Sequence, residues 1–175
     1  MKKQTAFICN VGLGIALYVA LSLCLQVPFF ENYYLCLGYV VMAVYCYYFG
    51  IAASVLVGAL GCVLYCILIN GLRGMPGWAL GNVFIGIFLS MVFRQTGKMK
   101  NFKTFFCINV IAIIVASAIG ILVIKSMTEC FLYAQPFLVR VSKNIYAFIS
   151  DAVVLVIGIP VAVMLKPFLR HFSKV

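Results

Sequence analysis

Two long apolar regions of this chain are joined by the glycine-rich segment NGLRGMPGWALGN, Asn70–Asn82. Glycine and proline interrupt regular structure, so the segment predicts a loop between two helices. Trp78 and Asn82 stand at its end, where the second apolar region begins. We expect the loop to form the lip of a binding cavity and to deliver these two side chains into the helix that follows.

The composition of the 175-residue chain identifies an integral membrane protein. Hydrophobic residues make up 66% of the sequence and charged residues 9%, and the mean hydropathy is +1.20. These values lie far outside the range of soluble domains. The net charge of +10 does not indicate nucleic-acid binding, because the basic residues stand at the ends of apolar runs, where they orient a chain in a lipid bilayer.

Six apolar stretches predict an all-α integral membrane protein, a bundle of six transmembrane helices that forms a single membrane domain over residues 1–175. Tyr48-Phe49-Gly50 is the expected break between the second and third helices. An aromatic loop at 29–34 follows the first helix, and a polar connection at 125–144 precedes the last. The expected helices are about 6–27, 35–49, 51–69, 79–93, 104–124 and 145–165.

The distribution of Lys and Arg orients this bundle. Six helices place both termini on one side, together with nine of the basic residues: Lys2, Lys3, Arg94, Lys98, Lys100, Lys103, Lys166, Arg170 and Lys174. The other side carries Arg73, Lys125, Arg140 and Lys143. The positive-inside rule therefore places both termini in the cytoplasm. The three acidic residues, Glu31, Glu129 and Asp151, then fall in the outer half.

Trp78, Asn82 and Gly86 are spaced so that they share one face of the fourth helix. An aromatic surface, an amide that donates and accepts, and a backbone gap suit a flat heterocyclic ligand. The alternative is that Trp78 anchors the helix at the interface and Asn82 hydrogen-bonds a neighbouring helix. The sequence leaves both interpretations open.

Asp151 lies inside the outer end of the last helix, with Asn144 on the same face. A carboxylate within a bilayer is costly unless it is paired or faces water, so Asp151 is a candidate functional residue. An internal salt bridge to Lys125, Arg140 or Lys143 is the alternative. Lys125 and Glu129, one helical turn apart, are expected to pair at the rim.

Two ridges of small residues allow close helix approach. Gly12, Ala16 and Ala20 form the first, and Ala112, Ala116 and Gly120 form the second. Packing inside the bundle is one interpretation and contact with an external partner is the other. No phosphate-binding loop, zinc-protease motif, metal-ligand cluster or close carboxylate pair is present in the sequence, so we expect the chain to bind rather than to catalyse and to need no metal or cofactor.

Short motifs along nearly the whole chain resemble the substrate-binding S-components of energy-coupling factor (ECF) transporters, in the riboflavin-transporter-like group. The motifs are Ala16-Leu-Tyr-Val-Ala20, Leu37-Gly38, Phe49-Gly50, Gly58-Ala-Leu-Gly61, Pro76-Gly-Trp-Ala-Leu-Gly-Asn82 and Gly158-Ile-Pro160. The sequence departs from many members at Tyr39 and Cys62, where they carry acidic residues.

The resemblance implies a vitamin-binding subunit in the bacterial plasma membrane that works with a transmembrane coupling subunit and two ATPase subunits. Gly12, Ala16 and Ala20 would contact the coupling subunit. The ligand would be a water-soluble vitamin or precursor with a flat ring, such as riboflavin, pyridoxine or the pyrimidine precursor of thiamine. The implied substrate-binding residues near the outer face are Asn32, Tyr34, Trp78, Asn82, Glu129, Tyr133, Asn144 and Asp151.

The sequence leaves two other functions open. One is a small membrane enzyme that acts on lipid, with Asp151 and Glu129 as its acid and base. The other is a structural subunit of a membrane complex, for which the polar residues of the outer half would be dispensable.

Overall fold

Apolar helices dominate the computed structural model, which describes residues 2–24, 27–30, 33–69, 71–72, 74–99 and 101–169. Within these ranges five helical segments are long and apolar enough to cross a bilayer. They are α1 (Lys2–Cys24), α3 (Gly50–Leu68), α4 (Met75–Thr96), the continuous stretch Phe102–Tyr133, and α7 (Phe137–Met164). The apolar α2 (Gly38–Tyr48) is shorter. The expected all-α bundle of six apolar helices is confirmed.

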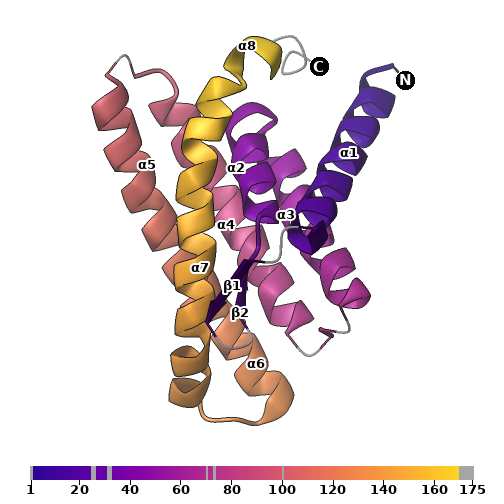
Figure 1. Cartoon of the computed structure of the whole chain (residues 1–175), viewed down its shortest axis with the longest axis vertical. Coiled ribbons are helices and arrows are strands. Elements are labelled where there is room, and N and C mark those ends of the chain that lie inside the picture. Colours follow the sequence, from indigo (N-terminus) through magenta and orange to yellow (C-terminus); the bar gives the residue numbers. More distant parts are fainter. Residues whose placement is uncertain are drawn as a thin grey trace.

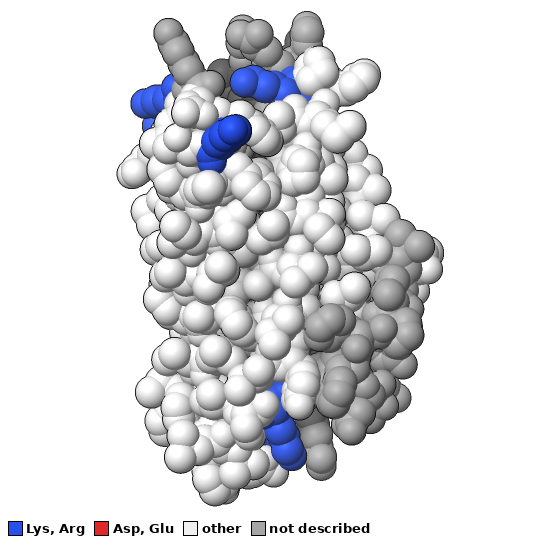
Figure 2. Space-filling model, turned by 60° about the vertical axis from the view of Figure 1, so that its left-hand side comes forward, with Lys and Arg blue, Asp and Glu red and all other residues white. Residues whose placement is uncertain are grey.

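Both described ends of the chain lie at the same end of the bundle (Figure 1). The short α8 (Lys166–Leu169) and the connection from α4 to the next helix are at that end too. Lys and Arg side chains gather there in Figure 2, with another basic side chain at the opposite end and a broad uncharged belt between them on the face shown. This distribution is that of a protein whose belt faces lipid and whose basic end faces the cytoplasm.

The break between α2 and α3 falls where the sequence predicts it. Gly50 has a backbone φ of +79°, a conformation that glycine adopts without the steric penalty of a side chain. The chain can therefore turn there and start a new helix at once. With 11 residues, α2 is about 16 Å long and does not by itself span the hydrocarbon core.

The expected polar connection at 125–144 is wrong, because most of it is helical. The helical stretch from Phe102 runs through α5 (Phe102–Ser117), a π-helix η1 (Ala118–Lys125) and α6 (Ser126–Tyr133). After three residues α7 begins at Phe137, eight residues before the expected start. Ser126, Glu129 and Asn144 made this region resemble a loop in sequence, yet all three are buried, because their polar groups meet one another inside the bundle.

The expected aromatic loop at 29–34 contains a β-hairpin. Strands β1 (Val27–Phe30) and β2 (Tyr33–Leu35) pair in antiparallel register, with Val27 opposite Leu35. Valine and aromatic residues favour strands, and pairing gives the backbone groups hydrogen-bond partners that an open loop near a membrane would lack. The hairpin lies beside α7, which β2 contacts.

Glycines let α4 approach η1 closely. A Cβ atom added to Gly81 would lie 2.6 Å from the carbonyl oxygen of Gly120, and one added to Gly77 would lie 2.9 Å from that of Lys125. These distances leave no room for a methyl group. Ala112 and Ala116, on the same ridge as Gly120, are buried too. The second ridge of small residues therefore packs inside the bundle.

Candidate ligand site and partner surface

A hydrogen-bond chain links three helices in the interior. The indole Nε1 of Trp78 on α4 donates to the hydroxyl of Tyr39 on α2 at 2.6 Å. That hydroxyl donates to Oδ1 of Asn82 at 2.7 Å, and Asn82 Nδ2 donates to the carbonyl of Gly58 on α3 at 3.0 Å. Asn82 and Tyr39 are fully buried, and Trp78 is half-buried. The predicted shared face of Trp78, Asn82 and Gly86 therefore points inward.

The buried Lys125 also contacts the Trp78 ring. Its Nζ is 5.4 Å from the centroid of the Trp78 ring, a cation–π distance, and the Tyr65 ring meets the same indole edge-on at 6.0 Å. Lys125 is the last residue of η1, and π-helical turns shift the side chains that follow them and occur often at functional sites. The widened helix thus directs a cation toward the aromatic face.

Glu129 is the centre of a second polar group, nearer to the turn between α6 and α7. Its Oε2 accepts from Asn144 Nδ2 at 3.1 Å and lies 3.6 Å from Arg140 Nη1. Asn144 Nδ2 also reaches Ser126 Oγ at 3.0 Å, and the Arg140 guanidinium lies over the Tyr133 ring at 5.2 Å. Among the described residues Glu129 thus pairs with Arg140, so the expected partner Lys125 is wrong.

Asp151 is 2% exposed, in the middle of α7. Its Oδ1 accepts from Ser150 Oγ at 3.4 Å, while its Oδ2 has no hydrogen-bond partner among the described residues. The Lys125 ammonium and the Tyr39 hydroxyl lie close enough to interact electrostatically with the carboxyl group. No salt bridge of 4.0 Å or less joins Asp151 to a basic residue of the described chain, so the predicted internal salt bridge is not formed.

Six of the eight predicted substrate-binding residues therefore lie in two neighbouring polar groups and at Asp151: Trp78, Asn82, Glu129, Tyr133, Asn144 and Asp151. Asn32 is outside the described residues, and for Tyr34 the structure describes the backbone of β2 but not the side chain. β2 contacts α7, which carries Asn144 and Asp151.

Sequence reasoning missed Tyr39 and Lys125 as members of the site. Tyr39 stood out in the sequence only as a departure from the resemblance, and in the structure it joins Trp78 to Asn82. The sequence places Lys125 in a polar connection at the rim. The lysine follows 21 residues with no charge, 104–124, and a lysine at the end of such an apolar run ordinarily lies at the membrane interface. The sequence therefore offers no signal that Lys125 turns inward.

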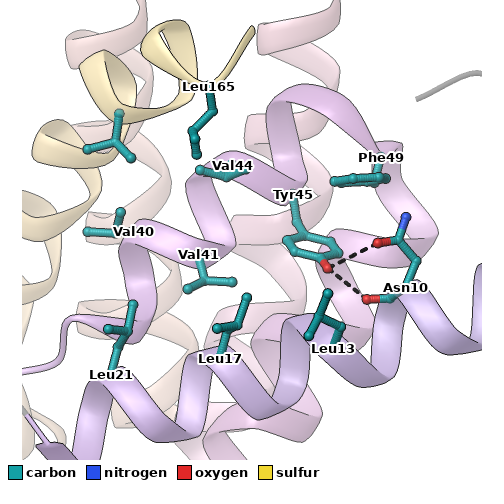
Figure 3. Close-up of a pocket in the computed structure, with 11 residues that line it drawn as sticks. Asn10, Leu13, Leu17, Leu21, Val40, Val41, Val44, Tyr45, Phe49 and Leu165 are labelled. Carbon is teal, nitrogen blue, oxygen red and sulfur yellow. Dashed lines mark hydrogen bonds between the residues drawn. The ribbon is translucent and has the colours of Figure 1, made fainter. Parts of the chain in front are cut away.

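An apolar groove opens on the other half of the molecule, between α1, α2 and α7 (Figure 3). Its volume is about 280 Å³. The Tyr45 hydroxyl, at one end, donates to the backbone carbonyl of Asn10 at 2.7 Å. The lining residues are Asn10, Leu13, Leu17, Leu21, Val40, Val41, Val44, Tyr45, Phe49, Val161 and Leu165.

The first ridge of small residues runs beside this groove. Gly12, Ala16 and Ala20 are all exposed on α1, and a Cβ atom added to Gly12 would meet nothing within 4 Å. Each ridge residue directly precedes a leucine that lines the groove. The ridge that contains Ala112 is buried, whereas the ridge on α1 faces outward. Its small side chains are therefore available to a partner.

Comparison with known proteins supplies the family. A model of the family "ECF-type riboflavin transporter, S component" matches residues 2–167, nearly the whole chain. A search of curated proteins and a search of solved structures found no match. S-components are multi-pass proteins of the cell membrane that bind substrate and are not enzymes, which removes the lipid enzyme from consideration. The chain belongs to the S-components of ECF-type riboflavin transporters, the substrate-binding subunits of vitamin uptake systems.

Proposed function

We propose that this subunit binds riboflavin itself, between the Trp78–Tyr39–Asn82 group and the Glu129–Asn144–Arg140 group. The observation that carries the proposal is the cluster of buried polar side chains around a single tryptophan, at the end of the bundle away from the basic, cytoplasmic end. Burying so many polar groups in a membrane protein is costly, and a ligand that is part aromatic and part polyol can contact both the tryptophan ring and the hydrogen-bonding groups.

The chemistry of the two groups matches the two parts of riboflavin. Trp78, which is half-buried, offers a ring surface for the flat three-ring system. Glu129 and Asn144 offer hydrogen-bonding groups for the hydroxyls of the ribityl chain. Two further buried atoms near the turn after α6, Gln135 Oε1 and Arg140 Nε, have no hydrogen-bond partner among the described residues, and hydroxyl groups can both donate to the first and accept from the second.

Uptake also requires the coupling subunit and the two ATPase subunits. We place the coupling subunit on the ridge Gly12–Ala16–Ala20 and the groove beside it, because small exposed residues next to an apolar groove allow another helix to approach closely. The binding groups share no residue with the groove. Ligand binding and partner docking therefore use separate surfaces, so mutations can separate them.

Two measurements test the proposal. The purified chain, titrated with riboflavin, should quench the fluorescence of its single tryptophan, and Trp78→Ala and Asn82→Ala should weaken riboflavin retention at least tenfold. Asn109→Ala is the matched control, because Asn109 is equally buried but hydrogen-bonds Thr96 in the cytoplasmic half. It should lower thermal stability and leave affinity unchanged.

The second measurement is co-purification with the coupling and ATPase subunits, which Trp78→Ala and Asn82→Ala should not disturb. A chain that assembles but retains no riboflavin would refute the ligand assignment. If both mutants bind riboflavin normally, Trp78 is an interfacial anchor and Asn82 a link between helices, and the outer polar residues serve structure alone.

A further inference from the structure

The Asp151 carboxylate contains a hydrogen-bond acceptor that the protein leaves unused. The side chain is only 2% exposed, and no described group donates to Oδ2. An unpaired carboxylate oxygen away from water costs free energy comparable to a lost charged hydrogen bond. The structure therefore points to a donor that arrives from outside the chain.

The neighbours of Asp151 are already engaged elsewhere. The Tyr39 hydroxyl donates to Asn82, and a hydroxyl has one hydrogen to give. The Lys125 ammonium lies over Trp78 and, in the described part of the chain, forms no ion pair of 4.0 Å or less with Asp151. Ser150 donates to Oδ1 at 3.4 Å, near the limit for a hydrogen bond. The donor that completes the site must fit beside Tyr39, an aromatic residue whose hydroxyl is bonded to Trp78.

We propose that Asp151 is a specificity-determining residue that accepts a hydrogen bond from an N–H group on the edge of the bound ring. This inference rests on the proposed riboflavin function. In a flavin the only ring N–H is the imide of the pyrimidine ring, and an unprotonated carboxyl oxygen such as Oδ2 can accept a hydrogen bond from it. Asp151 thus selects flat rings with an N–H edge and rejects rings in which that nitrogen is substituted.

The position of Asp151 along α7 gives the ligand a direction. Asn144 is seven residues earlier on the same helix, about 10 Å toward the turn after α6, and it contacts Glu129. The pyrimidine edge therefore lies deep, next to Asp151, and the ribityl chain extends toward Asn144 and Glu129 at the outer end. Trp78 contacts the ring between these points.

The test compares riboflavin with riboflavin methylated at the imide nitrogen, N3. The wild-type subunit should bind the methylated compound at least about tenfold more weakly, since it loses a hydrogen bond to the buried Asp151 carboxyl group and leaves that acceptor unpaired. Asp151→Ala should bind riboflavin more weakly and bind both compounds about equally. Asp151→Asn keeps the size of the side chain and should retain only part of the discrimination, which serves if the alanine variant does not fold.

Glu129→Gln is the matched control. It changes the ribityl end of the site and should lower the affinity for both compounds by the same factor, so that their ratio is unchanged. Equal binding of the two compounds by the wild type, or full discrimination by both Asp151 variants, would overturn the role of Asp151 while the riboflavin function stands. A wild-type subunit that binds neither compound would instead refute the proposed function.

Discussion

The hydroxyl of Tyr39 joins Trp78 to Asn82, accepting from the indole at 2.6 Å and donating to the amide oxygen at 2.7 Å. Both donors and the acceptor belong to side chains that are buried or half-buried. One hydroxyl group thus fixes the orientation of the tryptophan ring and of the amide at the same time, and it ties α2 to α4.

Replacing Tyr39 with Phe should therefore lower both the stability of the subunit and its affinity for riboflavin, because one hydroxyl group makes two hydrogen bonds. The substitution leaves Asn82 Oδ1 and Trp78 Nε1 without partners, at a cost of about 1–3 kcal/mol for each buried group. We expect a lower melting temperature and at least tenfold weaker riboflavin binding, measured by thermal denaturation and by ligand titration.

Tyr48→Phe is the control for this prediction. The Tyr48 hydroxyl donates to the carbonyl of Ala162 at 2.8 Å, so its loss also removes one tyrosine hydrogen bond, but at a distance from the binding groups. Stability should fall while affinity stays the same. Equal affinity in the two variants would mean that Tyr39 does not organise the site.

Gly81→Ala should destabilise the subunit by more than about 1 kcal/mol. The added Cβ would lie 2.6 Å from the carbonyl oxygen of Gly120, so α4 and η1 must separate. Gly12→Ala is the comparison, because nothing lies within 4 Å of its added Cβ, and alanine favours a helix over glycine. Thermal denaturation of the isolated subunit should show a decrease for Gly81→Ala and no decrease for Gly12→Ala.

Ala16→Trp should block assembly with the coupling subunit and leave riboflavin binding intact. Ala16 is exposed on α1 beside the groove, and a large ring there prevents close approach of another helix. Ile111→Trp on α5 adds the same ring at a site that is 62% exposed. Co-purification should fail for the first variant and succeed for the second, and normal assembly of Ala16→Trp would exclude the ridge as the docking surface.

Glu129→Gln should weaken the binding of riboflavin but not of lumiflavin, the flavin that carries a methyl group in place of the ribityl chain. The carboxylate is buried and pairs with Asn144 and Arg140, so its neutralisation also costs stability. Titration with both flavins separates the two effects, since only contact with the ribityl hydroxyls distinguishes the ligands. Equal weakening for both flavins would place Glu129 outside the ribityl end of the site.

One helix boundary of this fold could be predicted from the sequence, and another could not. The break at Gly50 was predictable because it depends on local backbone freedom. The region 125–144 was not, because hydropathy treats a polar residue as exposed. Whether Glu129 and Asn144 face water or one another depends on the neighbouring helix, and in this fold they face one another.

The two small-residue ridges illustrate the same limit. Gly12, Ala16 and Ala20 have the same spacing as Ala112, Ala116 and Gly120, so the sequence offers the same two interpretations for both. In the fold the second ridge is buried against α4, and the first is exposed beside the groove.

The sequence by itself determined that this protein is an α-helical membrane protein with cytoplasmic termini, because apolar length and the placement of Lys and Arg act independently of how helices pack. It also placed Trp78 and Asn82 on one face of the same helix. Only the tertiary structure brought Tyr39 between them, Lys125 onto the indole, and Arg140 rather than Lys125 to Glu129. Those contacts join residues from different helices, and their geometry depends on helix rotation and on the π-helical turns of η1, which local sequence preferences do not fix.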